Sequence, residues 1–527
     1  MRIKRYQLGL ILIIISLFSL FLNSRWQHIP AVKREALPQQ AEVSYGLSES
    51  IQTLDPAESS ALSEAKVMAH VFEGLVRYKP NSTQIEPALA TSWEISPDGL
   101  SWVFNLRRNV FFHDETPFNA QAVKFSVERQ LKPLKKDIMT YGSFVFGMVQ
   151  SVEIMDDYKV RFHLKTPYSP FLHNLAMPWA APMVSPSAVA KEGDKFHQYP
   201  VGTGPYYLAG WQKDTAILMS NENYWGTKAK IKSLAFTPLS PEQRLSALNT
   251  GEIQGADISG PESNEIGNQH IYIASQPAAS LGYLGMFNNR PPFNNDKIRR
   301  ALCVAIDREI IAQKLFNDKT LAANSILPPK ILGYNSDLKP YSGGTDKARA
   351  LLSAYGYPDG LNITLITYDC SRPYNPLGGK VLADIIKKQL SPAGFRVKVK
   401  TYPWHEFKSA LRDQEGDAFL FGWVGDHMDP DNFLYTLLSS DQNSQTNLTR
   451  YKNVEVDRLI NAAQKEPDET VRERLYYHAQ QIVLQDTPLV SLNYGKDRVA
   501  LRQDVKEVHL NPYGIPLFSQ AYKAAFR

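Results

Sequence analysis

The chain has 527 residues, of which 43% are hydrophobic, 11% aromatic and 21% charged. This is an ordinary globular composition, and it argues against a disordered, collagen-like or coiled-coil protein. The formal net charge is +5, and three of the cations, Arg2, Lys4 and Arg5, stand at the extreme N-terminus. The rest of the chain is nearly balanced, so a strongly basic nucleic-acid-binding protein is disfavoured.

The N-terminus combines this basic start with an apolar run from Leu8 to Leu22. A positive flank followed by about 15 apolar residues is typical of an export signal and is short for a spanning helix. No small-x-small cleavage triplet follows Leu22, and no cysteine nearby could carry a lipid. We therefore expect residues 1–24 to be a signal peptide or an uncleaved inner-membrane anchor, residues 25–42 to be a spacer, and the rest of the chain to lie in the periplasm.

The first predicted elements are a strand over Val43–Leu47 and a helix over Ala61–Leu75. Two β-hairpins follow, because alternating apolar residues flank the turns Ser96-Pro-Asp-Gly99 and Asp156-Asp157. In the first turn, proline presets φ and glycine accepts a positive φ. With a predicted helix over Ala120–Gln130 between them, the hairpins indicate a small α+β unit.

The pattern changes near Pro200, where Val201-Gly-Thr-Gly-Pro205 predicts a tight turn before a strand. This turn superficially resembles a dinucleotide-binding loop, but no helix follows it to receive a phosphate. Later segments alternate between strand and helix patterns, which predicts a domain with parallel strands. These segments are a helix near Pro241–Leu248, a strand over Ile363–Thr367, a helix over Val381–Leu390, a strand over Phe395–Val399, a strand from Ala418 and a helix over Leu475–Val483.

Common catalytic signatures are missing from the sequence. We find no Gly-x-Ser-x-Gly elbow, no glycine-rich loop ending in Gly-Lys-Ser/Thr, and no His-Glu-x-x-His. The two cysteines, Cys303 and Cys370, lack metal-type spacing; they could form one disulfide, although Cys303 in its apolar run favours a buried free thiol. We expect that the protein is not an enzyme and that it binds neither a cofactor nor a metal ion.

Asp426 is the first candidate binding residue. It follows an apolar strand pattern over Ala418–Val424, and α/β proteins place ligand-binding groups at strand ends. Asp429 and Asp431 come soon after it, where helix capping explains them better than Ca²⁺ binding. A hydrolase that uses these carboxylates is a remote alternative, because no nucleophile–base pair is recognisable.

Arg372 is the second candidate. It lies in Ser371-Arg-Pro-Tyr-Asn-Pro376, where two prolines stiffen the loop after a predicted strand. A guanidinium fork on a rigid loop suits bidentate recognition of a carboxylate. A structural salt bridge or a solvated arginine is the alternative.

A family resemblance rests on many segments taken together, which run in order along the chain. They are Ala88–Gly99, Trp102–Val110, His113-Asp114, Pro117–Ala120, Val123–Phe125, Pro200–Tyr206, Asn223–Gly226, Phe293–Asn295, Ile298–Leu302, Arg372–Pro376 and Gly422–Asp426. Together these segments resemble the extracytoplasmic peptide-binding proteins of ABC importers, the dipeptide/oligopeptide solute-binding proteins of family 5. Within that family the sequence is similar to dipeptide-binding proteins and, through Ser444–Leu448 and Leu510–Gly514, to the binding subunit of antimicrobial-peptide-resistance (Sap-type) transporters.

The resemblance implies an α/β, two-lobed periplasmic binding protein fold with a ligand cleft between the lobes. We expect lobe I to comprise residues 43–83, 200–282 and 498–527, and lobe II to comprise residues 283–497. Residues 84–199 would be an additional α+β subdomain of lobe I, which we call the insert.

The resemblance also implies residue roles. The aspartate that matches Asp426 meets the α-ammonium group of the ligand, and the arginine that matches Arg372 meets its α-carboxylate. Tyr374, Trp423 and Trp404 would line the cleft, although core packing is equally expected for Trp404.

The expected function is that of a monomeric receptor that binds short peptides and delivers them to an inner-membrane ABC permease. Relatives with this fold bind other ligands, so haem, a nickel chelate and a cationic antimicrobial peptide are alternatives. A membrane-tethered sensor or chaperone is a further alternative, because the cleavage site is weak.

Overall fold

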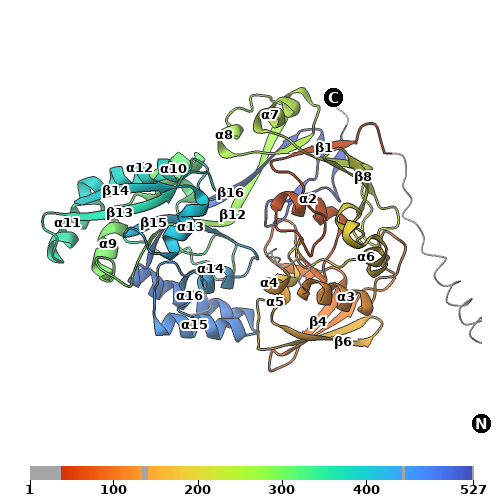
Figure 1. The fold of residues 1–527 in the computed structure, drawn as a ribbon, viewed down its shortest axis with the longest axis horizontal. Helices are drawn as coiled ribbons and strands as arrows, with labels where there is room; N and C mark the ends of the chain where they lie inside the picture. Colours follow the sequence, from red (N-terminus) through yellow and green to blue (C-terminus); the bar gives the residue numbers. More distant parts are fainter. Residues whose placement is uncertain (1–36, 133–140, 442–444, 525–527) are drawn as a thin grey trace, which may run out of the picture.

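The structure is a computed structural model that describes residues 37–132, 141–441 and 445–524. The predicted signal or anchor over residues 1–24 lies outside the described residues, as does most of the spacer. Among the described residues, no helix has both the length and the apolar character that a bilayer crossing requires. Figure 1 shows two bodies side by side, one containing most of the helices numbered α9 to α16 and the other containing α2 to α8.

A ten-stranded mixed sheet runs through both bodies, in the order β14-β13-β15-β12-β16-β11-β1-β10-β9-β8. Parallel pairing of β13 with β14 and with β15 confirms the parallel strands predicted from the strand–helix alternation. The strands are β1 (Val43–Leu47), β8 (Tyr206–Gln212), β9 (Thr215–Ser220), β10 (Ser233–Pro238), β11 (Gly255–Asp257), β12 (Ile271–Met286), β13 (Leu361–Tyr368), β14 (Phe395–Tyr402), β15 (Ala418–Val424) and β16 (Leu489–Arg502).

The long antiparallel strands β12 and β16 run between the two bodies (Figure 1). The first part of β12 pairs with β16 alone, whereas its second part also pairs with β15. Register shifts between Pro277 and Leu281 and between Gly282 and Tyr283 interrupt the ladder. The expected lobe boundaries, at 282/283 and 497/498, fall inside these two strands, and the division into lobes stays a prediction.

The insert is built on a separate four-stranded sheet in the order β4-β5-β7-β6. Both predicted hairpins are present, and Gly99 adopts a φ of 70° in the first turn. Buried and partly exposed residues alternate along β5 and β7, so one face of this sheet packs on a core. The elements of the insert are β4 (Ala90–Ile95), β5 (Ser101–Leu106), α3 (Ala120–Leu131), α4 (Gly142–Phe146), β6 (Val149–Asp156), β7 (Lys159–Leu164), α5 (Phe171–Leu175) and α6 (Pro186–Glu192).

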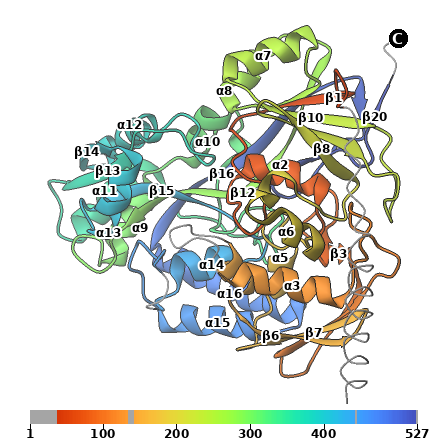
Figure 2. The ribbon, with the colours of Figure 1, turned by 45° about the vertical axis from the view of Figure 1, so that its right-hand side comes forward.

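Helices α14 to α16 lie beside the insert in both ribbon views (Figures 1 and 2). The contact includes a backbone hydrogen bond of 2.7 Å from Ser169 N to Gln464 O. The helices of residues 283–497 are α9 (Asp296–Val304), α10 (Arg308–Phe316), α11 (Gly344–Ala354), α12 (Gly379–Leu390), α13 (Trp404–Arg412), α14 (Asp431–Leu438), α15 (Val454–Lys465) and α16 (Glu469–Asp486).

Helix α2 (Leu62–Val71) ends four residues earlier than the sequence pattern predicts. Phe72 has extended backbone angles, and the chain then enters β2 (Val76–Tyr78), which pairs with β3 (Ile85–Pro87). The turn at residues 201–205 packs on this helix end, because Gly204 N donates to Val71 O at 2.9 Å. A Cβ atom on Gly202 would lie 2.1 Å from Val71 O, so close packing requires glycine there.

The remaining elements are two helices of the body that contains α2 to α8, and four short strands of the C-terminal tail. Helix α7 begins at the predicted residue, and its capping box uses Ser240 and Gln243. These elements are α7 (Pro241–Thr250), α8 (Gly260–Ser263), β17 (Val505–Lys506), β18 (His509–Leu510), β19 (Pro516–Leu517) and β20 (Tyr522–Lys523).

Candidate functional site

Asp426 and Arg372 lie at the same edge of the ten-stranded sheet. Strand β13 ends at Tyr368, four residues before Arg372, and β15 ends at Val424, two residues before Asp426. Because β13 and β15 are adjacent and parallel, their carboxyl ends meet at one edge, where open α/β sheets bind ligands.

A compact turn and an aromatic stack hold Arg372. Arg372 and Asn375 exchange backbone hydrogen bonds of 2.9 and 2.8 Å. The guanidinium carbon lies 4.1 Å from the ring centroid of Trp404, and that ring stacks on Phe421 at 5.9 Å with an interplanar angle of 9°. A cation over an aromatic face is attracted to it, so Trp404 both packs in this cluster and orients the arginine.

The Arg372 side chain is half-buried, and its Nε atom is buried without a hydrogen-bond partner among the described residues. No carboxylate in the described part of the chain forms an ion pair with it, so the salt-bridge alternative has no support there. An incompletely paired guanidinium at a sheet edge is suited to an anionic ligand group.

Tyr374 is only 2% exposed and packs on the sheet below the loop. Its ring lies so close to Gly422 that a Cβ atom there would be 2.4 Å from the ring. Its backbone carbonyl accepts from Asn493 Nδ2 at 3.0 Å. Burial raises the pKa of the Tyr374 hydroxyl group to about 12, and the neighbouring guanidinium of Arg372 opposes the shift. In this structure Tyr374 therefore anchors the loop, and the cleft-lining role expected for it stays a prediction.

Asp426 is half-buried and has no Lys, Arg or His ion-pair partner among the described residues. Its Oδ1 atom accepts from the Tyr141 hydroxyl group at 2.8 Å, and its backbone carbonyl accepts from the Tyr513 hydroxyl group at 3.2 Å. Burial raises the pKa of the carboxyl group, and hydrogen bonds from Tyr141 and Asn432 oppose that shift. A desolvated carboxylate without a cation beside it is suited to a cationic ligand group.

Asn432 is a positioning residue that the sequence interpretation missed. It is 2% exposed in α14, and its Oδ1 atom accepts from Trp423 Nε1 at 2.9 Å and from Asp426 N at 3.0 Å. The half-buried Trp423 and the backbone of Asp426 are thus fixed to one amide. The sequence signal was weak, because Asn432 stood in a segment already explained by helix capping.

Aromatic side chains from outside residues 283–497 pack together next to the segment after β15, and two of them, Tyr141 and Tyr513, contact Asp426. We call Tyr78, Tyr141, Phe144, Trp179 and Tyr513 the aromatic wall. Ring centroids are 4.7 Å apart between Trp179 and Tyr513, 5.9 Å between Tyr141 and Trp179, and 6.1 Å between Tyr141 and Phe144. These residues are scattered from position 78 to position 513, so no local pattern could have grouped them.

The capping role expected for Asp429 and Asp431 is wrong for Asp431. Helix α14 begins at Asp431 after Pro430, and Asp429 Oδ1 accepts from Asp431 N at 3.0 Å. Asp429 is fully buried and forms an ion pair of 2.8 Å with Arg472, which lowers its pKa against the effect of burial. Asp431 instead accepts from Tyr168 and Gln464.

Neither a metal cluster nor a disulfide is present in the part of the chain that the structure describes. No group of three or more His, Cys, Asp or Glu residues there could hold a metal ion. Cys303 is a buried free thiol, as favoured from the sequence, and Cys370 is a half-buried free thiol.

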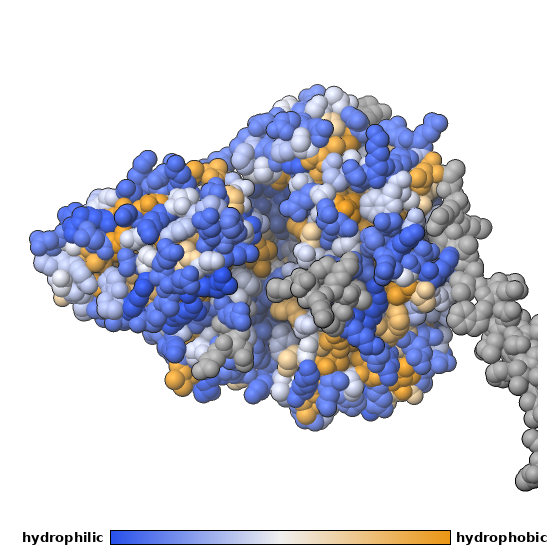
Figure 3. All heavy atoms as spheres, viewed as in Figure 1, coloured by the Kyte–Doolittle hydropathy of each residue, from blue (hydrophilic) through white to orange (hydrophobic). Residues whose placement is uncertain are grey.

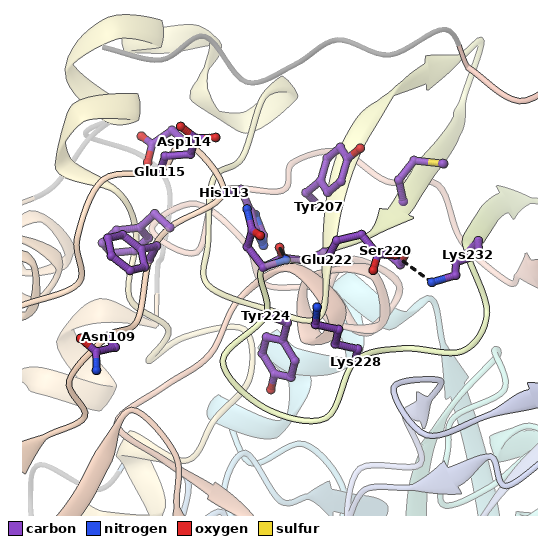
Figure 4. Close-up of a pocket in the computed structure, with 15 residues that line it drawn as sticks. Asn109, His113, Asp114, Glu115, Tyr207, Ser220, Glu222, Tyr224, Lys228 and Lys232 are labelled. Carbon is purple, nitrogen blue, oxygen red and sulfur yellow. Dashed lines mark hydrogen bonds and ion pairs between the residues drawn. The ribbon is translucent and has the colours of Figure 1, made fainter. Parts of the chain in front are cut away.

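The molecular surface is hollowed between the two bodies (Figure 3). A pocket of about 970 Å³ lies elsewhere, between the loop at 109–115 and the segment 219–232 (Figure 4). Some of its polar side chains already have partners within the protein: His113 Nε2 bonds to Gly204 O at 3.0 Å, and Lys232 pairs with Glu222 at 2.8 Å. We therefore place the candidate site at Asp426 and Arg372.

Comparisons with known proteins agree with the architecture. A profile of the family described as bacterial extracellular solute-binding proteins, family 5 Middle, matches residues 84–445. The dipeptide-binding protein of Escherichia coli (strain K12) is 32% identical over 472 residues, which is 84% of this chain and 87% of that protein. Heme-binding protein A of Haemophilus influenzae is 32% identical over 475 residues, which is 85% of this chain and 86% of that protein.

A solved structure gives the same architecture. The periplasmic binding protein DppA from Helicobacter pylori, in complex with the peptide STSA, is 31% identical and has a TM-score of 0.72. The match covers 92% of this chain and 98% of the other chain.

Proposed function

Because the chain belongs to the family 5 bacterial extracellular solute-binding proteins, we propose that its solute is a short peptide with free termini, held between Asp426 and Arg372. Its fold is the mixed α/β periplasmic binding protein fold. Proteins of this family are non-enzymatic components of ABC importers, which deliver a bound solute to a permease.

The observation that carries the proposal is the pair of opposite charges at one sheet edge. Within the described residues, neither Asp426 nor Arg372 forms an ion pair, although both side chains are half-buried. A peptide zwitterion that loses water in a cleft needs a fixed opposite charge at each end. The dipeptide-binding relative and the peptide-bound DppA structure support this ligand class.

Haem is the second candidate ligand, because a relative of equal identity is named a heme-binding protein. The two fixed charges favour a zwitterion over haem. A nickel chelate, a cationic antimicrobial peptide, the Sap-type assignment, a monomeric state and a tethered sensor or chaperone stay predictions. Native mass spectrometry of the purified protein separates these ligands by the mass that co-purifies.

The binding test uses calorimetry with Ala-Ala and the variants Asp426→Asn and Arg372→Gln. Each should weaken binding by about 2–5 kcal/mol, at least about thirtyfold, because each leaves one buried ligand charge unpaired. Blocking either end of the ligand should also weaken binding. N-acetyl-Ala-Ala offers Asp426 no ammonium group, and the C-terminal amide of Ala-Ala offers Arg372 no carboxylate.

Asp384→Asn and Arg474→Gln are the matched controls, because both side chains are exposed and neither belongs to the residues that form the candidate site. They should bind as the unmodified protein does. Unchanged dipeptide affinity in Asp426→Asn or Arg372→Gln, or haem as the co-purifying ligand, would overturn the proposal.

A further inference from the structure

Tyr141 links the insert directly to residues 283–497. It is the residue before helix α4 in the insert, and its hydroxyl group donates to Asp426 Oδ1 at 2.8 Å. The two residues are 285 positions apart in the chain. The carboxylate proposed to bind the ligand ammonium group is thus already contacted from the insert.

The aromatic wall holds the Tyr141 ring in place. Trp179 and Phe144 meet it edge-on, with interplanar angles of 77° and 76°. Trp179 is 8% exposed and packs edge-on against Tyr513, whose hydroxyl group donates to the Asp426 carbonyl. The wall therefore contacts Asp426 at two points, through its side chain and through its backbone.

A tyrosine hydroxyl group has one donor and two acceptor lone pairs. In Tyr141 the donor is used by Asp426, so the oxygen can still accept. Burial and the nearby carboxylate raise the pKa of Tyr141, so the hydroxyl group keeps its proton at ordinary pH. A ligand ammonium group has three N–H donors. A single carboxylate oxygen in a fixed position cannot satisfy all three of them.

We propose that Tyr141 determines specificity as a second acceptor for the ligand ammonium group, beside the Asp426 carboxylate. The inference rests on the proposed function. The ammonium group would bond both to Asp426 and to the Tyr141 oxygen, with the aromatic rings around it favouring a cation. Recognition of the peptide N-terminus would thereby couple the insert to residues 283–497.

The test compares Tyr141→Phe with Tyr168→Phe. Tyr168 also belongs to the insert, and its hydroxyl group reaches Asp431 Oδ2 at 3.3 Å, so the control removes a similar contact away from Asp426. In calorimetry with Ala-Ala, Tyr141→Phe should bind about ten- to a hundredfold more weakly, the loss typical of a hydrogen bond to a charged group. Tyr168→Phe should stay within about twofold of the unmodified protein.

A double variant tests whether Tyr141 and Asp426 act on the same ligand group. If Tyr141 and Asp426 share one ammonium group, adding Tyr141→Phe to Asp426→Asn should cost much less than it does alone, measured at millimolar peptide. Additive losses, an unchanged affinity in Tyr141→Phe, or an equal loss in Tyr168→Phe would overturn the inference. If the unmodified protein binds no peptide with free termini, the proposed function fails instead.

Discussion

Two buried aspartates in the segment at residues 426–431, Asp429 and Asp431, differ in the proton they hold. Asp429 is paired with Arg472, but Asp431 is buried beside Asp429 and has no ion-pair partner of its own among the described residues. Burial and the charge of Asp429 raise the pKa of Asp431 to about 7, although hydrogen bonds from Gln464 and Tyr168 and the charge of Arg472 oppose the shift. The folded protein therefore favours the protonated form of this one carboxyl group.

Asp431→Asn should change the pH dependence of stability. Between about pH 4 and pH 7 the folded protein holds a proton that the unfolded chain has released, so stability falls as pH rises, by at most about 1.4 kcal/mol per pH unit. The asparagine variant lacks this proton and should lose that fall, and above pH 7 it should match or exceed the unmodified protein. Urea unfolding from pH 4 to pH 8 measures the difference, with Asp384→Asn as control. Parallel curves for Asp431→Asn and the unmodified protein would contradict the assignment.

At the scale of elements, the edge formed by β13 and β15 positions the site. The loop after β13 is anchored because Tyr374 packs on Gly422 of β15, where a side chain would clash with the ring. Helix α14, which follows β15, supplies Asn432 to fix both Asp426 and Trp423. Two short connections that follow neighbouring parallel strands thus place an anion and a cation at the same edge of the sheet.

Gly422→Ala should displace Tyr374 and with it the loop that carries Arg372. The added Cβ atom would lie 2.4 Å from the ring, and overpacking of a well-packed site typically costs about 1–3 kcal/mol of folding stability. We expect a lower Tm by thermal unfolding and weaker Ala-Ala binding by calorimetry. The control is Gly267→Ala, because nothing lies within 4 Å of a Cβ atom at that exposed position. Equal behaviour of the two variants would show that Tyr374 does not anchor the loop.

At the scale of the whole molecule, β12 and β16 join the two bodies, and side chains of the insert contact the segment after β15. Tyr141 and Tyr168 bond to Asp426 and Asp431. A ligand that binds charges at this edge and meets the aromatic wall would add contacts that exist only in the folded protein.

A bound peptide should therefore stabilise the entire chain. At a free concentration of one hundred times Kd, Ala-Ala should contribute about 2.7 kcal/mol to the free energy of unfolding. Differential scanning calorimetry should show a rise in Tm with peptide, and the double variant Asp426→Asn/Arg372→Gln should show none at that concentration. A rise of the same size in the double variant would place the binding site elsewhere.

Local pattern in the sequence determined most elements and both candidate charges. The hairpins at residues 96–99 and 156–157 and the helices from Ala120 and Pro241 followed from turn chemistry and periodicity, which act over a few residues. Asp426 and Arg372 stood out because each follows a strand pattern. The end of α2 was misjudged, because the turn at residues 201–205, far along the chain, packs on it.

Only the tertiary structure decided what surrounds those charges. Tyr141 reaches Asp426 over 285 positions of sequence, and Tyr513 reaches it over 87. Asn432 is nearer in sequence, but its role depends on how α14 folds back beside β15. Side-chain periodicity reports which face of an element is buried and not which distant element covers it. The sequence by itself therefore identified the two opposite charges and the family that the chain resembles. Long-range packing decided which aromatic side chains lie beside Asp426.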